Sequence, residues 1–359
     1  VLGGRAMSII YDEQSLLEYI VSAVELTPEH PILIDKFLED ATEVDVDAIC
    51  DGTDIFIGGI MEHIELAGVH SGDSACIIPT VNISEKMLEK VEDATKALAM
   101  ELNVIGLINI QFAIKGEDLY VLEVNPRASR TVPFVSKTTG VPLARIAVKV
   151  MLGRKLKEFG LVGSLKKIPY ISVKEAVLPF NKFPGVDTLL SPEMKSTGEV
   201  MGIARHFGEA FYKAELAAGD VLPLEGKLFL SINRRSKVEL LEEMRALHQE
   251  GGFEFVATEG TAAFLNEHDI PCERVYKVSE GRPNIIDLVK NNEIDLIINT
   301  PTGKITRYDA FTIRQAAVRY HVPIITISAA KAAVRGLIEV KRRNELSVRS
   351  IQEYHAEVE

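Results

Sequence analysis

The sequence predicts a mixed α/β protein with an antiparallel sheet in its first part and a small parallel sheet in its last part. Before Gly219, short apolar strands are joined by hairpin turns and interspersed with amphipathic helices. After Gly219, strands and helices alternate one by one, which favours a parallel sheet covered on both faces. The composition, 47% hydrophobic and 26% charged, is that of a globular protein. We therefore expect two domains, at residues 1–218 and 219–359.

The elements of the first part follow from apolar periodicity and turn residues. Residues 32–34 form a short apolar run that predicts a strand, and residues 44–50 alternate as a half-buried strand does. The sequence Asp-Gly-Thr-Asp at 51–54 predicts the hairpin turn to a partner strand at 55–60. Further strands are expected at 108–114 and 119–124, and helices at 84–102 and 141–152.

The second part contains the pattern of a small parallel α/β sheet. Open sheets of this kind bind ligands at the carboxyl ends of their strands. Strands are expected at 228–233, 253–258, 296–300 and 324–328, and helices at 237–249, 261–268 and 307–320.

Charge and cysteine content restrict the class of protein. The formal net charge is −12, from 40 basic and 52 acidic residues, so no nucleic-acid surface is expected and an anionic ligand needs a local cluster of cations. The three cysteines lie far apart without metal-binding spacing, which indicates a reducing, cytoplasmic location. We expect neither a membrane span nor a signal peptide, and the absence of an initial Met suggests that the protein begins upstream.

One group of polar residues predicts a magnesium and phosphate site. Glu123 and Asn125 lie two apart on a predicted strand, so they leave the same face, and a four-residue loop places Gln111 opposite Glu123. Carboxylate and amide oxygens are ligands that suit Mg²⁺. Arg127 and Arg130 follow the strand end, where guanidinium groups can clamp phosphoryl oxygens. The alternative is a solvated strand end with ordinary surface arginines.

Three other segments predict nucleotide contacts less specifically. Gly3-Gly4-Arg5 can form a backbone lid over phosphates, although such a pair is often only a turn. The segment 34–43 can offer backbone groups to an adenine edge, with Glu43 for ribose hydroxyls. In the polar loop at 68–74, His70 is either a general base or a hydrogen-bonding residue.

A second anion site is predicted at the carboxyl edge of the parallel sheet. Thr258 and Thr261 lie where a strand meets a helix N-terminus, which is a natural phosphate cradle. Lys277, Asn299 and Thr300 lie near other predicted strand ends on the same edge. The alternative is that Thr261 caps a helix and Asn299 only ends a strand.

Several segments closely resemble the large subunit of carbamoyl-phosphate synthase. The resemblance covers essentially the whole chain and implies a truncated ATP-grasp module followed by a methylglyoxal-synthase-like regulatory domain. The segments are 1–7 (VLGGRAM), 43–48 (EVDVDA), 68–74 (GVHSGDS), 123–127 (EVNPR), 131–137 (TVPFVSK), 179–187 (PFNKFPGVD) and 194–202 (MKSTGEVMG).

The resemblance implies an ATP-dependent ligase that phosphorylates carbamate to carbamoyl phosphate with Mg²⁺ or Mn²⁺, for arginine or pyrimidine biosynthesis or both. It implies three partners: a glutaminase small subunit, an upstream half of the large subunit and an allosteric effector such as UMP. Neither nucleic acid nor membrane is an expected partner. Because the front of the ATP-grasp module would lie upstream of Val1, we expect the chain alone to be inactive.

The resemblance also implies roles for individual residues. Arg127 and Arg130 would bind the transferring phosphoryl group and carbamate, and Gln111, Glu123 and Asn125 would bind the metal. The nucleotide-binding residues would be Gly4, Arg5, Lys36, Leu38, Glu43, Gly68, Val69, His70, Ser71, Gln111 and Glu123. The effector site would comprise Thr258, Thr261, Lys277, Asn299 and Thr300.

Two other classes of function remain open at this point. The chain could be a regulatory nucleotide- or phosphate-binding module only, or a lyase of the methylglyoxal synthase type. Such a lyase needs a carboxylate base beside the phosphate, and the segment 299–304 contains no acid, which favours a sensor. An interaction module would rest on the basic tail at 331–349, which is better read as a solvated helix face.

Overall fold

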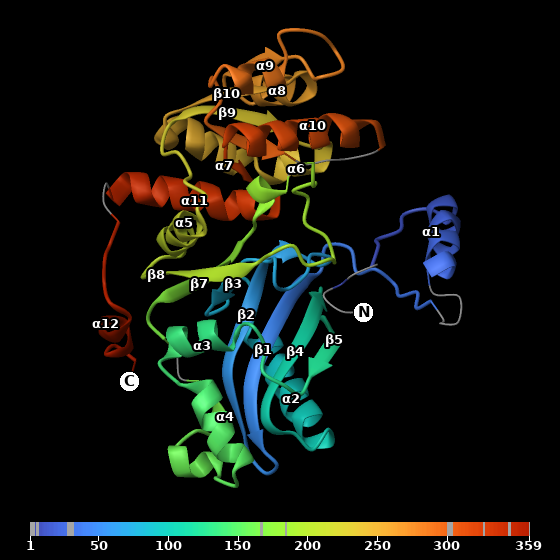
Figure 1. The fold of residues 1–359 in the computed structure, drawn as a ribbon. Coiled ribbons are helices and arrows are strands. Elements are labelled where there is room, and N and C mark those ends of the chain that lie inside the picture. The colour runs from blue at the N-terminus through green and yellow to red at the C-terminus, as the bar shows by residue number, and fades with distance from the viewer. Residues whose placement is uncertain are drawn as a thin grey trace.

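The computed structural model describes Gly4 and residues 7–26, 32–165, 168–183, 185–299, 304–325, 327–343 and 346–358. These residues form two sheets with helices around them (Figure 1). The first sheet has eight strands and the second has five. The predicted mixed α/β class is confirmed, with an antiparallel sheet before a parallel one.

The first sheet has the strand order β5-β4-β1-β2-β3-β7-β8, in which neighbours are antiparallel, and β6 adds to β2 in parallel. The predicted hairpin and the strand pair after the long helix are confirmed. The strands are β1 (Thr42–Asp51), β2 (Ile55–Leu66), β3 (Cys76–Ile78), β4 (Ile105–Lys115), β5 (Asp118–Asn125), β6 (Gly163–Ser164), β7 (Ile171–Val177) and β8 (Gly198–Ala204).

Helices cover both faces of this sheet. Helix α2 (Glu85–Glu101) packs Val91 against Val44 and Val46, and it begins at Ser84, whose hydroxyl accepts the Met87 N–H at 3.3 Å. Helices α3 (Val132–Thr139) and α4 (Leu143–Met151) pack on the opposite face. Two short 3-10 turns (Leu156–Phe159 and Phe180–Lys182), helix α1 (Glu13–Leu26) and helix α5 (Phe207–Ala218) complete this part.

The second sheet is parallel throughout, with the strand order β11-β10-β9-β12-β13. Its strands are β9 (Gly226–Ser231), β10 (Phe253–Thr258), β11 (Cys272–Val275), β12 (Leu296–Asn299) and β13 (Ile324–Ile325). Its helices are α6 (Arg234–Glu239), α7 (Leu241–Ala246), a π-helical turn (Leu247–Gly251), α8 (Glu259–Glu267), α9 (Ile285–Lys290), α10 (Lys304–Tyr320), α11 (Ile327–Arg343) and α12 (Ile351–His355).

Helix α11 joins the two parts of the molecule. It runs beside α5 below the second sheet (Figure 1), and one hydrophobic cluster contains Phe211 of α5, Leu230 of β9 and Leu337 of α11. The chain then returns to the first part, where the Tyr354 ring meets the Tyr170 ring edge-on at 5.1 Å. The division at Gly219, which ends α5 with φ +102, therefore stays a prediction.

Three sequence-based elements need correction. Residues 32–34 form no strand: they lie in an irregular segment in which Leu33 is 83% exposed. The helix expected at 237–249 is divided at Leu240, where φ −102 and ψ 4 interrupt the helical backbone. The strand expected at 324–328 ends at Ile325 because α11 already begins at Ile327.

Acidic residues gather where β2, β7 and α5 meet. Burial raises the pKa of Glu65, Glu175 and Glu215, and repulsion between neighbouring carboxylates adds to the shift for Glu175 and Glu215. The pKa of Glu175 is raised to about 8. All three carboxyl groups therefore hold their protons to a higher pH than an ordinary carboxyl group does.

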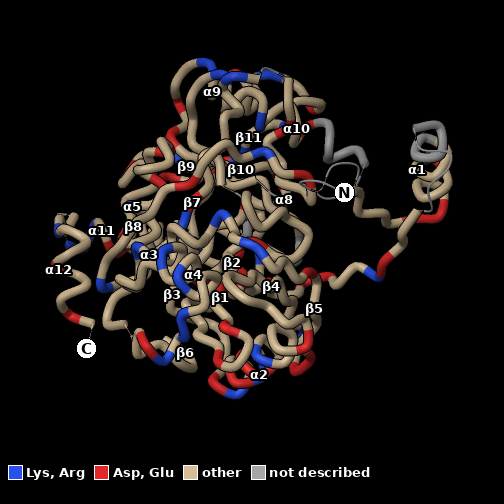
Figure 2. Tube along the Cα trace, turned by 60° about the horizontal axis from the view of Figure 1, so that its bottom comes forward, with Lys and Arg blue, Asp and Glu red and all other residues tan. Residues whose placement is uncertain are grey.

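The remaining charged residues mostly alternate in sign along the outer surface. Figure 2 shows acidic and basic residues intermixed over α2, where Lys96 lies 3.8 Å from Glu92 and 3.6 Å from Asp93. Such exposed pairs contribute little to stability. In the described part of the chain, no helix combines the length and the apolar character that crossing a membrane requires.

Candidate active site

The face of the first sheet opposite α2 carries a polar array. Because side chains alternate along β1, Val44 and Val46 face α2 while Asp45 and Asp47 face the other way. The pairing of β1, β4 and β5 then aligns polar residues in two rows across the strands. These rows are Asp45–Gln111–Glu123 and Asp47–Asn109–Asn125.

The predicted position of Gln111 opposite Glu123 is confirmed, and Asn125 lies two residues further along the same strand. The Asn125 amide oxygen accepts a hydrogen bond from Arg127 Nη2 at 3.1 Å. Among the described residues, no group of three His, Cys, Asp or Glu could hold a metal ion. One carboxylate and two amides are a hard-oxygen set that fits Mg²⁺. Their role as metal ligands stays a prediction.

The turn that carries the two predicted arginines is tied to Asp47. Asp47 is 1% exposed, and its carboxylate accepts hydrogen bonds from Asn109 Nδ2 (3.0 Å), Ser129 Oγ (2.7 Å) and Thr131 Oγ1 (2.6 Å). Burial raises the pKa of Asp47 to about 6, although these three hydrogen bonds oppose the rise. The sequence analysis missed Asp47 because its partners lie more than sixty residues away along the chain.

Arg130 and His70 come together at the start of the polar loop. A Cβ on Gly72 would lie 3.0 Å from Arg130 Nη1 and 3.2 Å from His70 Nδ1, so both side chains converge on this glycine. The backbone N–H of Gly72 donates to His70 Nδ1 at 3.0 Å, which places the proton of the neutral ring on Nε2. Burial lowers the pKa of His70, and Arg130 adds to the effect. The neutral form of His70 is therefore favoured, with Nε2 as its donor.

The other predicted nucleotide residues also meet. Glu43 Oε1 accepts the Gly68 N–H at 3.2 Å. A Cβ on Gly68, which has φ +107, would lie 3.0 Å from the ring of Phe37, and Phe37 is flanked by the predicted residues Lys36 and Leu38. The structure therefore brings the segment 36–38, Glu43 and the start of the loop that includes Val69 and Ser71 into one region.

Two further residues adjoin this region. His63 is buried with Nδ1 3.5 Å from Glu43 and Nε2 3.4 Å from Asp45, and the sequence analysis missed it. Although burial disfavours the charged ring, Cys76 and Asp45 hold the pKa of His63 well above its ordinary value. Gly4, with φ +67, lies against the backbone of Pro192. Arg5 lies outside the described residues.

The edge of the second sheet gathers the predicted effector residues. Thr258 is the N-cap of α8, so Thr261 does not cap this helix. The buried hydroxyl of Thr261 instead donates to the Ile232 carbonyl at 3.3 Å. Lys277 lies 3.6 Å from Glu280. Burial and the nearby Lys277 both lower the pKa of Lys237, which places a second cation at this edge that sequence reasoning missed.

Asn299 ends β12 at the same edge. Its side chain is buried; Oδ1 accepts from Arg314 Nη1 at 3.2 Å, while Nδ2 has no hydrogen-bond partner among the described residues. Arg314 also donates from Nε and Nη2 to the two oxygens of Asp187, both at 2.7 Å. Arg314 therefore links this edge to the segment that leads back to the first sheet. Thr300 lies outside the described residues.

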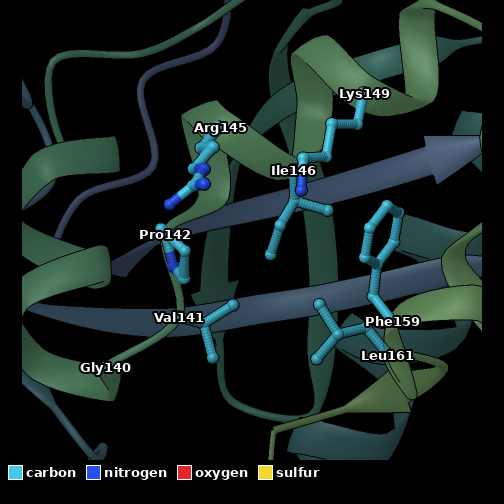
Figure 3. A pocket seen from close by; sticks show the side chains of 8 residues that line it. All are labelled: Gly140, Val141, Pro142, Arg145, Ile146, Lys149, Phe159 and Leu161. Carbon is cyan, nitrogen blue, oxygen red and sulfur yellow. The ribbon is translucent and has the colours of Figure 1, made fainter.

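A cavity of about 430 Å³ lies beside α4, away from these residues. Figure 3 shows Arg145 and Lys149 on the helix above it and Phe159 and Leu161 on the far side. Lys149 Nζ lies 5.3 Å from the centre of the Phe159 ring, which is a cation–π contact. None of the predicted site residues lines this cavity.

Comparisons with known proteins show the family of this chain. The family model described as "Carbamoyl-phosphate synthase L chain, ATP binding domain" matches residues 1–159, and the one described as "MGS-like domain" matches residues 239–326. A carbamoyl phosphate synthase large chain from Methanosarcina barkeri is 55% identical over all of this chain, which covers 90% of that relative. The chain belongs to the carbamoyl phosphate synthase large chain family.

Other members of the family are longer. The large chain from Archaeoglobus fulgidus is 58% identical over 99% of this chain, and that from Acidobacterium capsulatum is 55% identical over 99%. This chain spans 33% of the length of each. A biotin carboxylase structure from Campylobacter jejuni has a TM-score of 0.46 and 14% identity, over 60% of this chain and 54% of that chain, which is too distant to bear on function.

Proposed function

We propose that this chain forms part of an ATP-dependent ligase that phosphorylates carbamate to carbamoyl phosphate. The observation that carries the proposal is the strand register that puts Gln111, Glu123 and Asn125 on one face, beside the turn of Arg127 and Arg130. Family membership supports it, since the relatives are named as carbamoyl phosphate synthase large chains.

In this proposal, each group acts by position and charge. Phosphoryl transfer needs neutralisation of the charge on the transferring group and alignment of its partners, and it needs no side-chain nucleophile. Mg²⁺ or Mn²⁺, held by Gln111, Glu123 and Asn125, would supply part of that neutralisation. Arg127 and Arg130 present guanidinium N–H groups to the phosphoryl oxygens, and neutral His70 donates from Nε2.

The nucleotide base and ribose would occupy the region formed by Lys36, Leu38 and Glu43 with the loop from Gly68 to Ser71. The contact of Glu43 with the Gly68 N–H at 3.2 Å supports this, because it joins the two predicted halves of the pocket. Gly4 and Arg5 would lie over the phosphates.

The complete activity requires partners beyond these residues. We propose a cytoplasmic assembly with an upstream half of the large chain and a glutaminase small subunit. The length of most relatives supports the first partner, since the chain spans a third of them. The purified chain is therefore expected not to form ATP from MgADP and carbamoyl phosphate. ATP formation by the chain alone would contradict this part.

The carboxyl edge of the second sheet is proposed as the site of an anionic nucleotide effector such as UMP. The N-terminus of α8 at Thr258 offers backbone N–H groups, and Lys237 and Lys277 supply two cations. The buried Asn299 Nδ2, which lacks a partner among the described residues, is a donor available to a ligand. With Thr261 beneath them, these groups suit a phosphate monoester.

Thermal unfolding with UMP or MgADP tests both sites. A ligand that binds only the native state at 100 times its Kd adds about 2.7 kcal/mol to the unfolding free energy. We expect UMP to raise the Tm of the chain and MgADP to leave it unchanged. A shift with MgADP but not with UMP would show a more complete nucleotide site and remove the effector from this edge.

A further inference from the structure

Asp47 is a buried carboxylate that is satisfied only by neutral side chains. It lies in the middle of β1, 1% exposed, with Asn109 opposite on β4 and Gly59 opposite on β2. Its three hydrogen bonds come from an amide and two hydroxyls, as described above. Burying an ionised group without a cation costs stability. If position 47 served packing alone, an apolar side chain there would make the fold more stable.

Two of the three donors belong to the turn after β5. Ser129 and Thr131 stand on either side of Arg130, and their hydroxyls lie 2.9 Å apart, so one carboxylate holds both. Ser129 Oγ also accepts the Val132 N–H at 3.2 Å, which fixes the first turn of α3. The turn is thereby fastened at its two ends to the central strand of the sheet.

The arginines themselves have few other constraints. Both are exposed; among the residues that the structure describes, Arg127 bonds only within its own turn, to Asn125 Oδ1 (3.1 Å) and the Ala128 carbonyl (3.0 Å). Arg130 Nη1 contacts Met194 Sδ at 2.7 Å and Ser196 Oγ at 3.4 Å. The placement of the two guanidinium groups therefore depends on where the backbone of the turn is held.

We propose that Asp47 is a positioning residue that, through Ser129 and Thr131, fixes the turn of Arg127 and Arg130 for binding the phosphoryl group. The inference rests on the proposed function, because it takes these arginines as the phosphoryl-binding groups. Preorganised donors bind a phosphoryl oxygen without the cost of ordering them on binding, so loosening the turn weakens anion binding while the fold persists. Asp47 acts through the arginines and touches no ligand.

The test is a titration of the whole chain with inorganic pyrophosphate at pH 7.5. The side-chain Nε–H NMR signals of Arg127 and Arg130 are monitored during the titration. We expect Asp47→Asn to weaken the affinity reported by these signals about fivefold. Circular dichroism of the same sample should match that of the unmodified chain. Asp51→Asn is the matched control, since Asp51 is a buried carboxylate on β1 that holds a different turn.

A double-mutant cycle separates positioning from general loss of stability. The pair Ser129→Ala, Thr131→Val removes the same contacts from the side of the turn, and it should weaken binding as much as Asp47→Asn. In an Arg130→Ala background, Asp47→Asn should have a smaller further effect than in the unmodified chain, because only Arg127 is left to be positioned. If Asp47→Asn unfolds the chain, the pair of turn substitutions carries the test.

Three results would overturn the proposal. An unchanged affinity at the arginines in folded Asp47→Asn removes Asp47 from this role and leaves the proposed function standing. An equal loss of affinity in Asp47→Asn and in Asp51→Asn indicates general destabilisation. Arginine signals of the unmodified chain that do not respond to pyrophosphate remove the phosphoryl site itself, and with it both proposals.

Discussion

At the scale of single residues, the candidate metal site depends on one charge. Gln111 and Asn125 offer neutral amide oxygens, so Glu123 is the sole carboxylate of the predicted set. Mg²⁺ and Mn²⁺ are attracted chiefly by anionic oxygens, and amides complete their coordination. A substitution that keeps the shape of Glu123 and removes its charge therefore isolates the electrostatic part of metal binding.

Glu123→Gln is expected to weaken Mn²⁺ binding to the chain at least about tenfold, because it removes the one anionic ligand. The measurement is paramagnetic broadening of the side-chain amide signals of Gln111 and Asn125 during a Mn²⁺ titration. Glu117→Gln, at the exposed turn of the same hairpin, is the control and should leave the titration unchanged. Equal affinities of Glu123→Gln and the unmodified chain would exclude the predicted ligand set.

Whether the role of a residue could be predicted depends on how far along the sequence its contact partners lie. Gln111, Glu123 and Asn125 belong to one hairpin, so strand periodicity and a short loop are enough to place them on one face. The roles of Asp47 and His63 become visible only through contacts between segments that are far apart in sequence. Such contacts depend on the strand order of the sheet, which periodicity does not contain.

At the scale of elements, α5 packs so closely against β8 that no side chain fits between their backbones. A Cβ on Gly202 of β8 would lie 2.0 Å from the Ala210 carbonyl oxygen and 2.5 Å from the Ala214 nitrogen. The helix therefore rests on bare backbone at this residue. The contact is between backbones, so neither side can relieve it by changing a rotamer.

Gly202→Ala is expected to lower the unfolding free energy by about 3 kcal/mol or to prevent folding, because α5 must move away from β8. Gly198→Ala, on the same strand, is the control, since its nearest neighbour is 4.0 Å away. Urea denaturation followed by circular dichroism measures both. A Gly202→Ala variant as stable as the control would show that α5 can shift at little cost.

The elements that the sequence predicted are those with long, regular patterns. The helix at 84–102 and the strands of the two hairpins have the periodicity of one buried face, and they were placed within a few residues. Helix α5 was not predicted, and the tail at 331–349, expected as a solvated helix face, largely forms α11, which is instead buried against α5. Buried positions on several sides of α11 blur the one-faced pattern that identifies a helix in a sequence.

At the scale of the whole molecule, hydrogen bonds connect the two proposed anion sites. Arg314 joins Asn299 to Asp187, and the segment after Asp187 reaches the polar loop, where Asp73 accepts the N–H groups of Lys195 (2.7 Å) and Ser196 (2.9 Å). The Ser196 hydroxyl in turn donates to the Gly72 carbonyl at 3.0 Å. We therefore expect a ligand bound at the proposed effector site to shift the loop that faces Arg130.

Asp187→Asn is expected to uncouple the two sites. In the unmodified chain, saturating UMP should change the pyrophosphate affinity measured at Arg130 about fivefold, and pyrophosphate should change the UMP affinity by the same factor. In Asp187→Asn both factors should fall below about two, with UMP still bound. Glu250→Gln, which breaks the exposed pair with Arg342, is the control. Coupling that survives Asp187→Asn would exclude this connection.

The carboxyl groups clustered around α5 change the proton content of the folded chain. The formal charge of −12 counts every carboxyl as ionised, but Glu175, with a pKa of about 8, retains its proton at pH 7, and burial shifts the pKa of Glu215 in the same direction. Unfolding releases the Glu175 proton, so the folded state gains relative stability in acid and loses it as the pH rises toward 8. The folded protein is therefore less negative than its composition states, and its unfolding acidifies the solution.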